Sequence, residues 1–146
     1  MRKNTRALLA AAALLTTLSV GLTGCAAIEQ AVTGEKSITY DDAAAFRADS
    51  GVAAPWMPAD ATAIAMTQST RAADAALTLA SSTPLDESLC AEVERQSAPL
   101  FTVTEAVDVY KTTTAFACGD WTVVQTPGGW LGWTPGHPDE KEQSPS

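Results

Sequence analysis

The stretch that decides the fold is residues 114–134, which read TAFACGDWTVVQTPGGWLGWT. Short apolar runs are separated there by Gly119-Asp120 and by Pro127-Gly128-Gly129. Closely spaced turn sequences of this kind are typical of antiparallel strands joined by tight hairpins. We therefore expect neighbouring antiparallel strands in this part of the chain.

The Gly119-Asp120 pair fits a two-residue hairpin loop, and this loop sets the register of the strands on either side. In that register Cys118 faces Trp121, and Phe116 faces Val123. The register places Cys118 on an apolar face of the sheet.

The second turn leaves two registers open, which differ in the tryptophan that goes inside. With Pro127-Gly128 in the centre, we expect Trp130 to point away from the core. The core face then holds four other apolar residues: Trp121, Val123, Leu131 and Trp133. With Gly128-Gly129 in the centre, a slip of one residue puts Trp130 on the core face instead. We favour the first register because it buries more apolar surface.

Upstream, apolar residues alternate at 61–68 and at 75–80, and this pattern predicts two more strands. The alternative is a single alanine-rich helix over 61–80, which Thr67 and Thr70 disfavour without excluding it.

Two short helices are expected to pack on the sheet. The first begins at Thr39-Tyr40-Asp41-Asp42, with Thr39 as its cap, and continues past Phe46. The second begins at Thr83-Pro84, with proline in the first helical position. Its apolar face holds Leu85, Leu89 and Val93, with Cys90 beside them.

A further apolar alternation, from Phe101 to Val109, predicts a strand that ends at a bulge or turn near residues 111–114. The fold class expected from these elements is α+β. We expect a small antiparallel sheet with one or two short helices and one disulfide.

The N-terminus carries the strongest signal in the chain. Three basic residues occupy positions within the first six, and an uncharged run follows from Ala7 to Val20. That run is too short to cross a hydrocarbon core of about 30 Å, and it matches the apolar part of an export signal. The next residues, Leu22-Thr23-Gly24-Cys25, resemble the lipobox of bacterial lipoproteins.

The lipobox resemblance implies cleavage just before Cys25 and attachment of a diacylglyceryl group to its sulfur. Two acyl chains give durable membrane attachment, whereas a single chain binds only marginally. The alternatives are an ordinary cleaved signal or an uncleaved transmembrane anchor. We expect a lipid-anchored protein on the extracytoplasmic face of the cell membrane.

The chain has three cysteines. If Cys25 carries lipid, Cys90 and Cys118 have only each other as partners in an exported protein, and we expect a disulfide between them. On the chain-entropy model such a bridge is worth about 3 to 4 kcal/mol.

The boundaries that follow are a signal peptide at 1–24, a lipidated N-terminus and tether at 25–38, a globular domain at 39–134 and a disordered tail at 135–146. Removal of the signal peptide leaves 17 acidic and six basic residues, a net charge near −11. Such a charge repels phosphate backbones, so we expect no nucleic-acid partner.

We find no enzyme signature. His137 is the only histidine and lies in the predicted tail, where it is a poor general base. The acidic pairs Asp86-Glu87 and Glu92/Glu94 fit a solvated surface. Gly128-Gly129 precedes a strand, which a phosphate-binding loop does not do. We expect no catalytic residue, no metal ion and no cofactor.

Four tryptophans stand out in so small a domain. We expect Trp121 and Trp133 in the core. An exposed indole can stack on a sugar ring or anchor a protein interface, and Trp130 and Trp56 are the candidates for binding a partner.

Three motifs and a central Cys90 carry a wider resemblance: Trp56-Met57-Pro58-Ala59-Asp60-Ala61, Cys118-Gly119-Asp120-Trp121 and Gly129-Trp130-Leu131-Gly132-Trp133. With its alanine- and threonine-rich composition, the chain resembles small lipoproteins common in actinobacteria, a group without assigned activity. The resemblance spans most of the mature chain and implies a location but no reaction.

The leading hypothesis is a non-catalytic, lipid-anchored binding module for another envelope component. We favour a protein over a glycan as that component. The rival is a small hydrolase or accessory module acting on cell-wall polymer, which needs a cleft with Trp130 beside two converging acids. A third hypothesis is a purely structural spacer.

Overall fold

The computed structural model describes residues 32–103 and 107–145. The proposed signal peptide and Cys25 lie outside these residues. The strands are β1 (Glu35–Asp42), β2 (Thr62–Ser69), β3 (Ala75–Ala80), β4 (Ala91–Glu94), β5 (Thr114–Cys118), β6 (Trp121–Thr126) and β7 (Gly129–Thr134). The helices are α2 (Ala43–Asp49), the 3₁₀ helix η1 (Val109–Lys111) and α3 (Pro138–Lys141).

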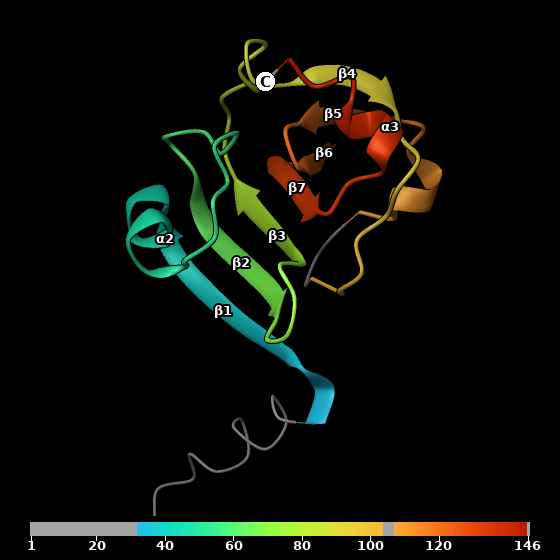
Figure 1. Cartoon of the computed structure of the whole chain (residues 1–146). Coiled ribbons are helices and arrows are strands. Elements are labelled where there is room, and N and C mark those ends of the chain that lie inside the picture. The colour runs from blue at the N-terminus through green and yellow to red at the C-terminus, as the bar shows by residue number, and fades with distance from the viewer. Residues whose placement is uncertain (1–31, 104–106, 146) are drawn as a thin grey trace, which may run out of the picture.

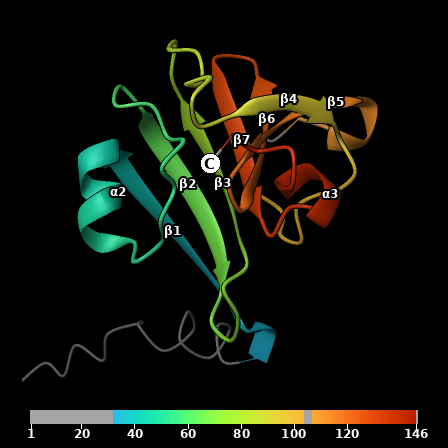
Figure 2. The same cartoon turned by 45° about the horizontal axis from the view of Figure 1, so that its top comes forward.

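All seven strands form one antiparallel sheet in the order β1-β2-β3-β7-β6-β5-β4. Figure 1 shows α2 beside the β1 end of the sheet and α3 beside the strands at the other end. The same arrangement is seen from a second direction in Figure 2. The expected α+β class, with an antiparallel sheet, two short α-helices and one disulfide, is confirmed.

Both faces of the sheet are buried at its centre, around β6 and β7, whereas the edge strand β1 is mostly exposed. Neighbouring residues of one strand, such as Val123 and Val124, belong to two different apolar clusters, because side chains alternate across a strand. One cluster contains Phe46 of α2. The other contains Val103 and Val109 from the connection between β4 and β5. The sheet is therefore the middle layer of the domain.

The registers of both hairpins are confirmed. The faces of the sheet predicted for Trp130, Leu131 and Trp133 are wrong. Cys118 pairs with Trp121, and Thr126 pairs with Gly129, so Pro127-Gly128 forms the second loop. Residues directly opposite in an antiparallel pair project to the same side. Trp130, opposite Gln125, therefore shares a cluster with Trp121. Leu131 and Trp133 lie on the opposite face, which is buried as well.

The two strands predicted at 61–68 and 75–80 are confirmed as β2 and β3, so the alternative of one helix is wrong. The helix after residue 42 is also confirmed, but its cap is Asp42, whose Oδ1 accepts a hydrogen bond from the Ala45 N–H at 2.8 Å. Thr39 lies within β1 instead. Because β1 pairs with β2 from Glu35 onward, residues 35–38 belong to the domain, and the predicted tether extends too far.

The predicted helix from residue 83 to Val93 is wrong. The Asp86 carboxylate accepts hydrogen bonds from the backbone N–H and the hydroxyl of Ser88, which fixes a turn. The chain then enters β4, where Val93 is buried opposite Ala115 of β5. Pairing with β5 overrides the local helix signal.

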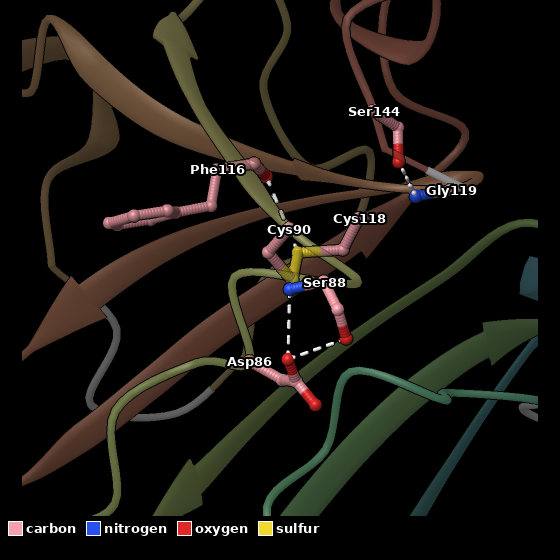
Figure 3. The surroundings of a disulfide bond; sticks show 7 residues. All are labelled: Asp86, Ser88, Cys90, Phe116, Cys118, Gly119 and Ser144. Carbon is pink, nitrogen blue, oxygen red and sulfur yellow. Dashed lines mark hydrogen bonds between the residues drawn. A yellow bond between two sulfur atoms is a disulfide. The ribbon is translucent and has the colours of Figure 1, made fainter.

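The predicted disulfide between Cys90 and Cys118 is confirmed (Figure 3). Because Ala91 pairs with Ala117, the two cysteines lie directly across from one another on neighbouring segments, with Cα atoms 4.3 Å apart. Both are buried. The bridge therefore joins the start of the edge strand β4 to the end of β5, not a helix to the sheet.

Two further predictions need correction. No strand forms at 101–103 or 107–109, and residues 104–106 lie outside the described part of the chain. Val103 and Val109 are buried nonetheless, because this connection covers one face of the sheet. Of the bulge or turn predicted near 111–114, the structure has a turn that begins slightly earlier, the 3₁₀ helix η1.

The C-terminal residues described, 135–145, do not form the predicted disordered tail. They include α3, whose Glu140 is buried. His137 caps this helix, since its Nδ1 accepts a hydrogen bond from the Asp139 N–H at 3.2 Å. A histidine expected to be loose is held in place by the helix that follows it.

Trp56 packs on the sheet where β7 has no side chain. A Cβ added to Gly132 would lie 2.4 Å from Cζ2 of the Trp56 ring. The ring also lies 5.8 Å from that of Trp121, measured between centroids. Gly132 therefore makes room for the indole.

We predict that Gly132→Ala lowers the free energy of unfolding by about 1 to 3 kcal/mol through overpacking, as measured by urea denaturation. The smaller ring of a Trp56→Phe background should reduce this penalty. An equal penalty in both backgrounds would contradict the assigned contact.

Candidate functional site

One cavity lies at the end of the sheet where β1 begins. It has a volume of about 560 Å³ and is formed by four separate segments: residues 50–53 after α2, the β2–β3 hairpin at 68–75, Asp120-Trp121 and Thr134-Pro135. This volume lies within the range of small-ligand pockets. We call this cavity the cleft.

The walls of the cleft are held by hydrogen bonds. The Trp121 indole N–H donates to the Ala53 carbonyl at 2.9 Å, which ties the segment after α2 to β6. In the hairpin, the Ser69 hydroxyl accepts from the backbone N–H groups of Arg71 and Ala72 at 3.1 and 3.0 Å. The cleft is thus preformed, and a ligand would not have to order its walls.

The lining of the cleft is a mixture of polar and apolar residues, most of them small. Its two ionisable side chains are Asp74 and Asp120. Asp120 also forms an ion pair with Lys141 at the end of α3. No histidine or cysteine lines the cleft, so its lining offers hydrogen-bond acceptors rather than a nucleophile with an adjacent base. Within residues 32–103 and 107–145, no group of three or more metal-ligating side chains comes together.

Trp130 lines a different cavity, of about 400 Å³, at the opposite end of the sheet. The lining of that cavity contains no acidic residue, so it lacks the arrangement required by the hydrolase hypothesis. The Trp130 indole N–H donates to the Thr83 carbonyl at 3.2 Å.

The expectation that Trp130 and Trp56 offer exposed rings to a partner is wrong, because they are only 6% and 2% exposed. Each packs against an aromatic neighbour, Trp130 on Phe116 and Trp56 on Trp121. The expectation that Trp121 and Trp133 are core residues is confirmed.

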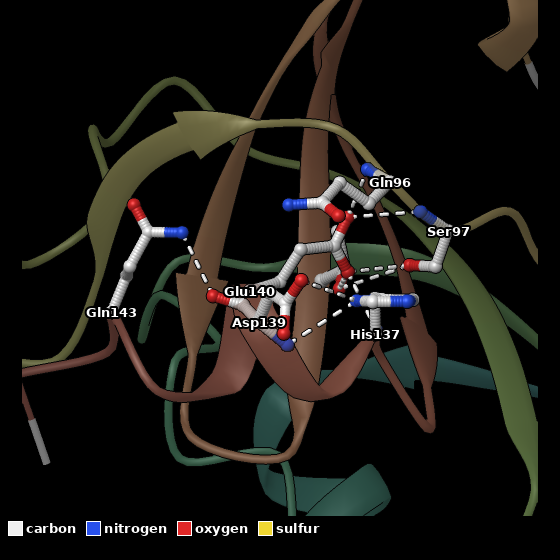
Figure 4. Close-up of polar contacts among 7 residues, drawn as sticks. Gln96, Ser97, His137, Asp139, Glu140 and Gln143 are labelled. Carbon is white, nitrogen blue, oxygen red and sulfur yellow. Dashed lines mark hydrogen bonds and ion pairs between the residues drawn. The ribbon is translucent and has the colours of Figure 1, made fainter.

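Sequence reasoning missed Glu140, the one buried carboxylate in the described part of the chain, which is 1% exposed (Figure 4). It accepts five hydrogen bonds. The donors are the backbone N–H groups of Gln96, Ser97 and His137 and the hydroxyls of Ser97 and Thr122, at 2.6 to 3.0 Å. Ser97 Oγ in turn accepts from the Trp133 indole N–H at 2.9 Å.

Burial alone would raise the pKa of Glu140. The hydrogen bonds from Ser97, Thr122, Gln96 and His137 outweigh that effect and hold the pKa below the usual glutamate value. The carboxylate is therefore ionised at neutral pH and fastens α3 to the sheet. The sequence signal that could have found it is the capping pattern His137-Pro138-Asp139-Glu140.

Two buried polar atoms have no hydrogen-bond partner among the described residues: the Tyr40 hydroxyl oxygen and the Trp56 Nε1. Burial, and then the charge of Asp49, raise the pKa of Tyr40. Neither residue lines the cleft, so they add no binding group to it.

Comparisons with protein-family models, with curated proteins and with solved structures gave no match for this chain. Among the described residues, no helix has the length and apolar character needed to span a bilayer.

Proposed function

We propose that this chain is a lipid-anchored protein of the extracytoplasmic membrane face, where its acidic domain binds another envelope component without catalysing a reaction. The anchor is a diacylglyceryl group on Cys25. We favour an envelope protein over a glycan as the partner. None of the tryptophans among the described residues exposes its indole ring for stacking on a sugar.

The observation that carries the anchor is the pairing of Cys90 with Cys118. A structural disulfide suits a protein that folds outside the cytoplasm. The chain has three cysteines, so this pairing leaves Cys25, in its lipobox-like setting, as the remaining one. A free thiol exposed to oxidants is a liability, and attachment of the diacylglyceryl group through a thioether removes it.

The observation that favours binding is the cleft. It lies beside the first residues of the domain, since the carbonyl of Gly34 accepts a hydrogen bond from the Thr70 N–H in the hairpin that lines it. The chain from Cys25 to Glu35 spans at most about 35 Å when extended. A domain tethered in this way keeps its cleft near the membrane surface, within reach of other membrane-bound proteins.

Metabolic labelling with a fatty-acid analogue tests the anchor. We expect label on the native protein and none on a Cys25→Ala variant. The matched control is a Cys90→Ala/Cys118→Ala variant, which keeps Cys25 and should still be labelled. Label on the Cys25→Ala variant, or none on the native chain, would refute the anchor.

Photo-crosslinking in intact cells tests the binding role. A photoreactive residue at Ala73, which is exposed and lines the cleft, should give a discrete cross-linked product. The same residue at Ser82, exposed at the other end of the sheet, is the control. No product at either position would support the structural spacer instead.

A further inference from the structure

The lining of the cleft carries negative charge that no basic residue of the lining balances. Asp74 and Asp120 belong to it, and no lysine, arginine or histidine of the described residues does. Asp74 is half-buried, and its carboxylate forms no hydrogen bond or ion pair within the part of the chain that the structure describes. Because binding surfaces have complementary potentials, this lining favours a cationic group as its ligand.

Asp120 shows which kind of cation can be held there. Its Oδ1 contacts the ammonium group of Lys141, which lies at the end of α3 and outside the lining of the cleft. The side chains of Lys141 and Asp120 are 61% and 69% exposed. An exposed ion pair contributes little to stability, so another ammonium group can replace Lys141 at low cost.

The other basic side chains near the cleft also lie outside its lining. Arg71, in the β2–β3 hairpin, packs against Gly34, since a Cβ added to Gly34 would lie 3.1 Å from the guanidinium carbon. Lys36 is exposed on β1, opposite Gln68 of β2. Neither Arg71 nor Lys36 is in the lining, so neither takes the place of a bound cation.

The apolar part of the lining suits an aliphatic stem. Small apolar side chains lie in the same cleft as the two acids, among them Ala53, Ala72 and Ala75. Lysine combines the two chemistries, because its four methylene groups pack on apolar surface while its ammonium group pairs with carboxylates. An ammonium group has three donors, so it can contact two separate carboxylates.

We propose that the cleft receives a lysine side chain of the envelope protein that this chain binds, with the ammonium group paired with Asp74 and Asp120. The inference rests on the proposed binding function and adds the chemistry of the partner. Lys141 competes with the incoming lysine for Asp120 and so limits the affinity of the cleft. The volume of about 560 Å³ lies in the range that holds whole small ligands, so one side chain fits together with its neighbours.

Nuclear magnetic resonance of the full-length protein in a non-ionic detergent tests the proposal with defined peptides. The probe is a short capped peptide of alternating glycine and lysine. Its control is the same peptide with acetyl-lysine, which keeps the stem and lacks the charge. The lysine peptide should shift the amide signals of residues 50–53 and 72–75, which line the cleft or adjoin its lining, and the control should bind at least several-fold more weakly.

Two variants of opposite effect make the test specific to the cleft. Asp74→Asn should weaken binding of the lysine peptide several-fold, whereas Glu92→Gln, which removes the same charge from the exposed surface of β4, should leave it unchanged. Lys141→Gln should strengthen binding, because it frees Asp120. Lys111→Gln, the same charge change in η1, should have no effect. The dispersion of the amide signals shows that each variant folds.

Equal binding of the lysine and acetyl-lysine peptides would overturn the proposal. An equal loss from Asp74→Asn and Glu92→Gln would also overturn it, since the peptide would then respond to net charge alone. The cross-linked product obtained in cells at Ala73 separates this inference from the binding role. If that product forms unchanged in the Asp74→Asn variant, the lysine contact is wrong and the binding role stands. If no product forms although the lysine peptide binds in the cleft, the binding role alone fails.

Discussion

Replacing both Cys90 and Cys118 with alanine is expected to lower the free energy of unfolding by about 3 to 4 kcal/mol. The bridge restricts the unfolded chain between Cys90 and Cys118. In the folded state it also fixes the edge strand β4, which has only β5 beside it in the sheet. For a domain of this size, that loss is a large share of the total stability.

Thermal unfolding with and without a reductant checks this prediction. The native chain should unfold more than about 10 °C higher when oxidised than when reduced, since 1 kcal/mol corresponds to about 4 to 8 °C in a small domain. The Cys90→Ala/Cys118→Ala variant should unfold near the reduced native chain and should not respond to reductant. Equal midpoints for the oxidised and reduced native chain would show that the bridge does not contribute.

Turn chemistry made the hairpins predictable. Gly119-Asp120 and Pro127-Gly128 occupy two-residue loops, and the register of the strands around them follows from loop length alone. What the turns could not reveal is how many faces are buried. The predicted faces are wrong for a different reason: in the confirmed register Trp130 lies opposite Gln125 and so on the face of Trp121. Leu131 and Trp133 lie on the other face, which is buried there as well.

The remaining errors have a common cause, since local signals were overridden by distant partners. Residues 83–93 have a good helix start, but Val93 is buried by pairing with β5. The C-terminal residues are polar and rich in proline, yet Glu140 receives its hydrogen bonds largely from residues more than forty positions away in the chain, Gln96 and Ser97. Periodicity and composition carry no information on such contacts.

The cleft was also beyond prediction, because four segments that are distant in the sequence form it. Its lining consists largely of alanine, serine and glycine, which carry no motif. By contrast, the pairing of Cys90 with Cys118 is predictable from the cysteine count, since the expectation that Cys25 carries lipid leaves one bridge to form. Counting the cysteines predicted the disulfide, whereas no sequence pattern predicted the cleft.

Glu140→Gln is expected to lower the free energy of unfolding by about 3 kcal/mol at neutral pH, because buried hydrogen-bond donors are left without an acceptor. The carboxylate has two oxygens that together accept five hydrogen bonds. The amide keeps one oxygen and turns its own N–H groups toward donors. Urea denaturation measures the loss, and Glu142→Gln, an exposed neighbour in the same segment, is the control that should change stability by less than about 0.5 kcal/mol.

The pH dependence separates the lost charge from a simple packing defect. The pKa of Glu140 is lowered in the folded state, so ionised Glu140 stabilises the fold fully above the pKa of an unfolded glutamate, near 4.3. This contribution is lost as the pH falls through the lower pKa of the folded state. The stability difference between the native chain and Glu140→Gln should therefore shrink below about pH 4. A difference that stays constant down to pH 2 would show that the charge of Glu140 does not hold α3 in place.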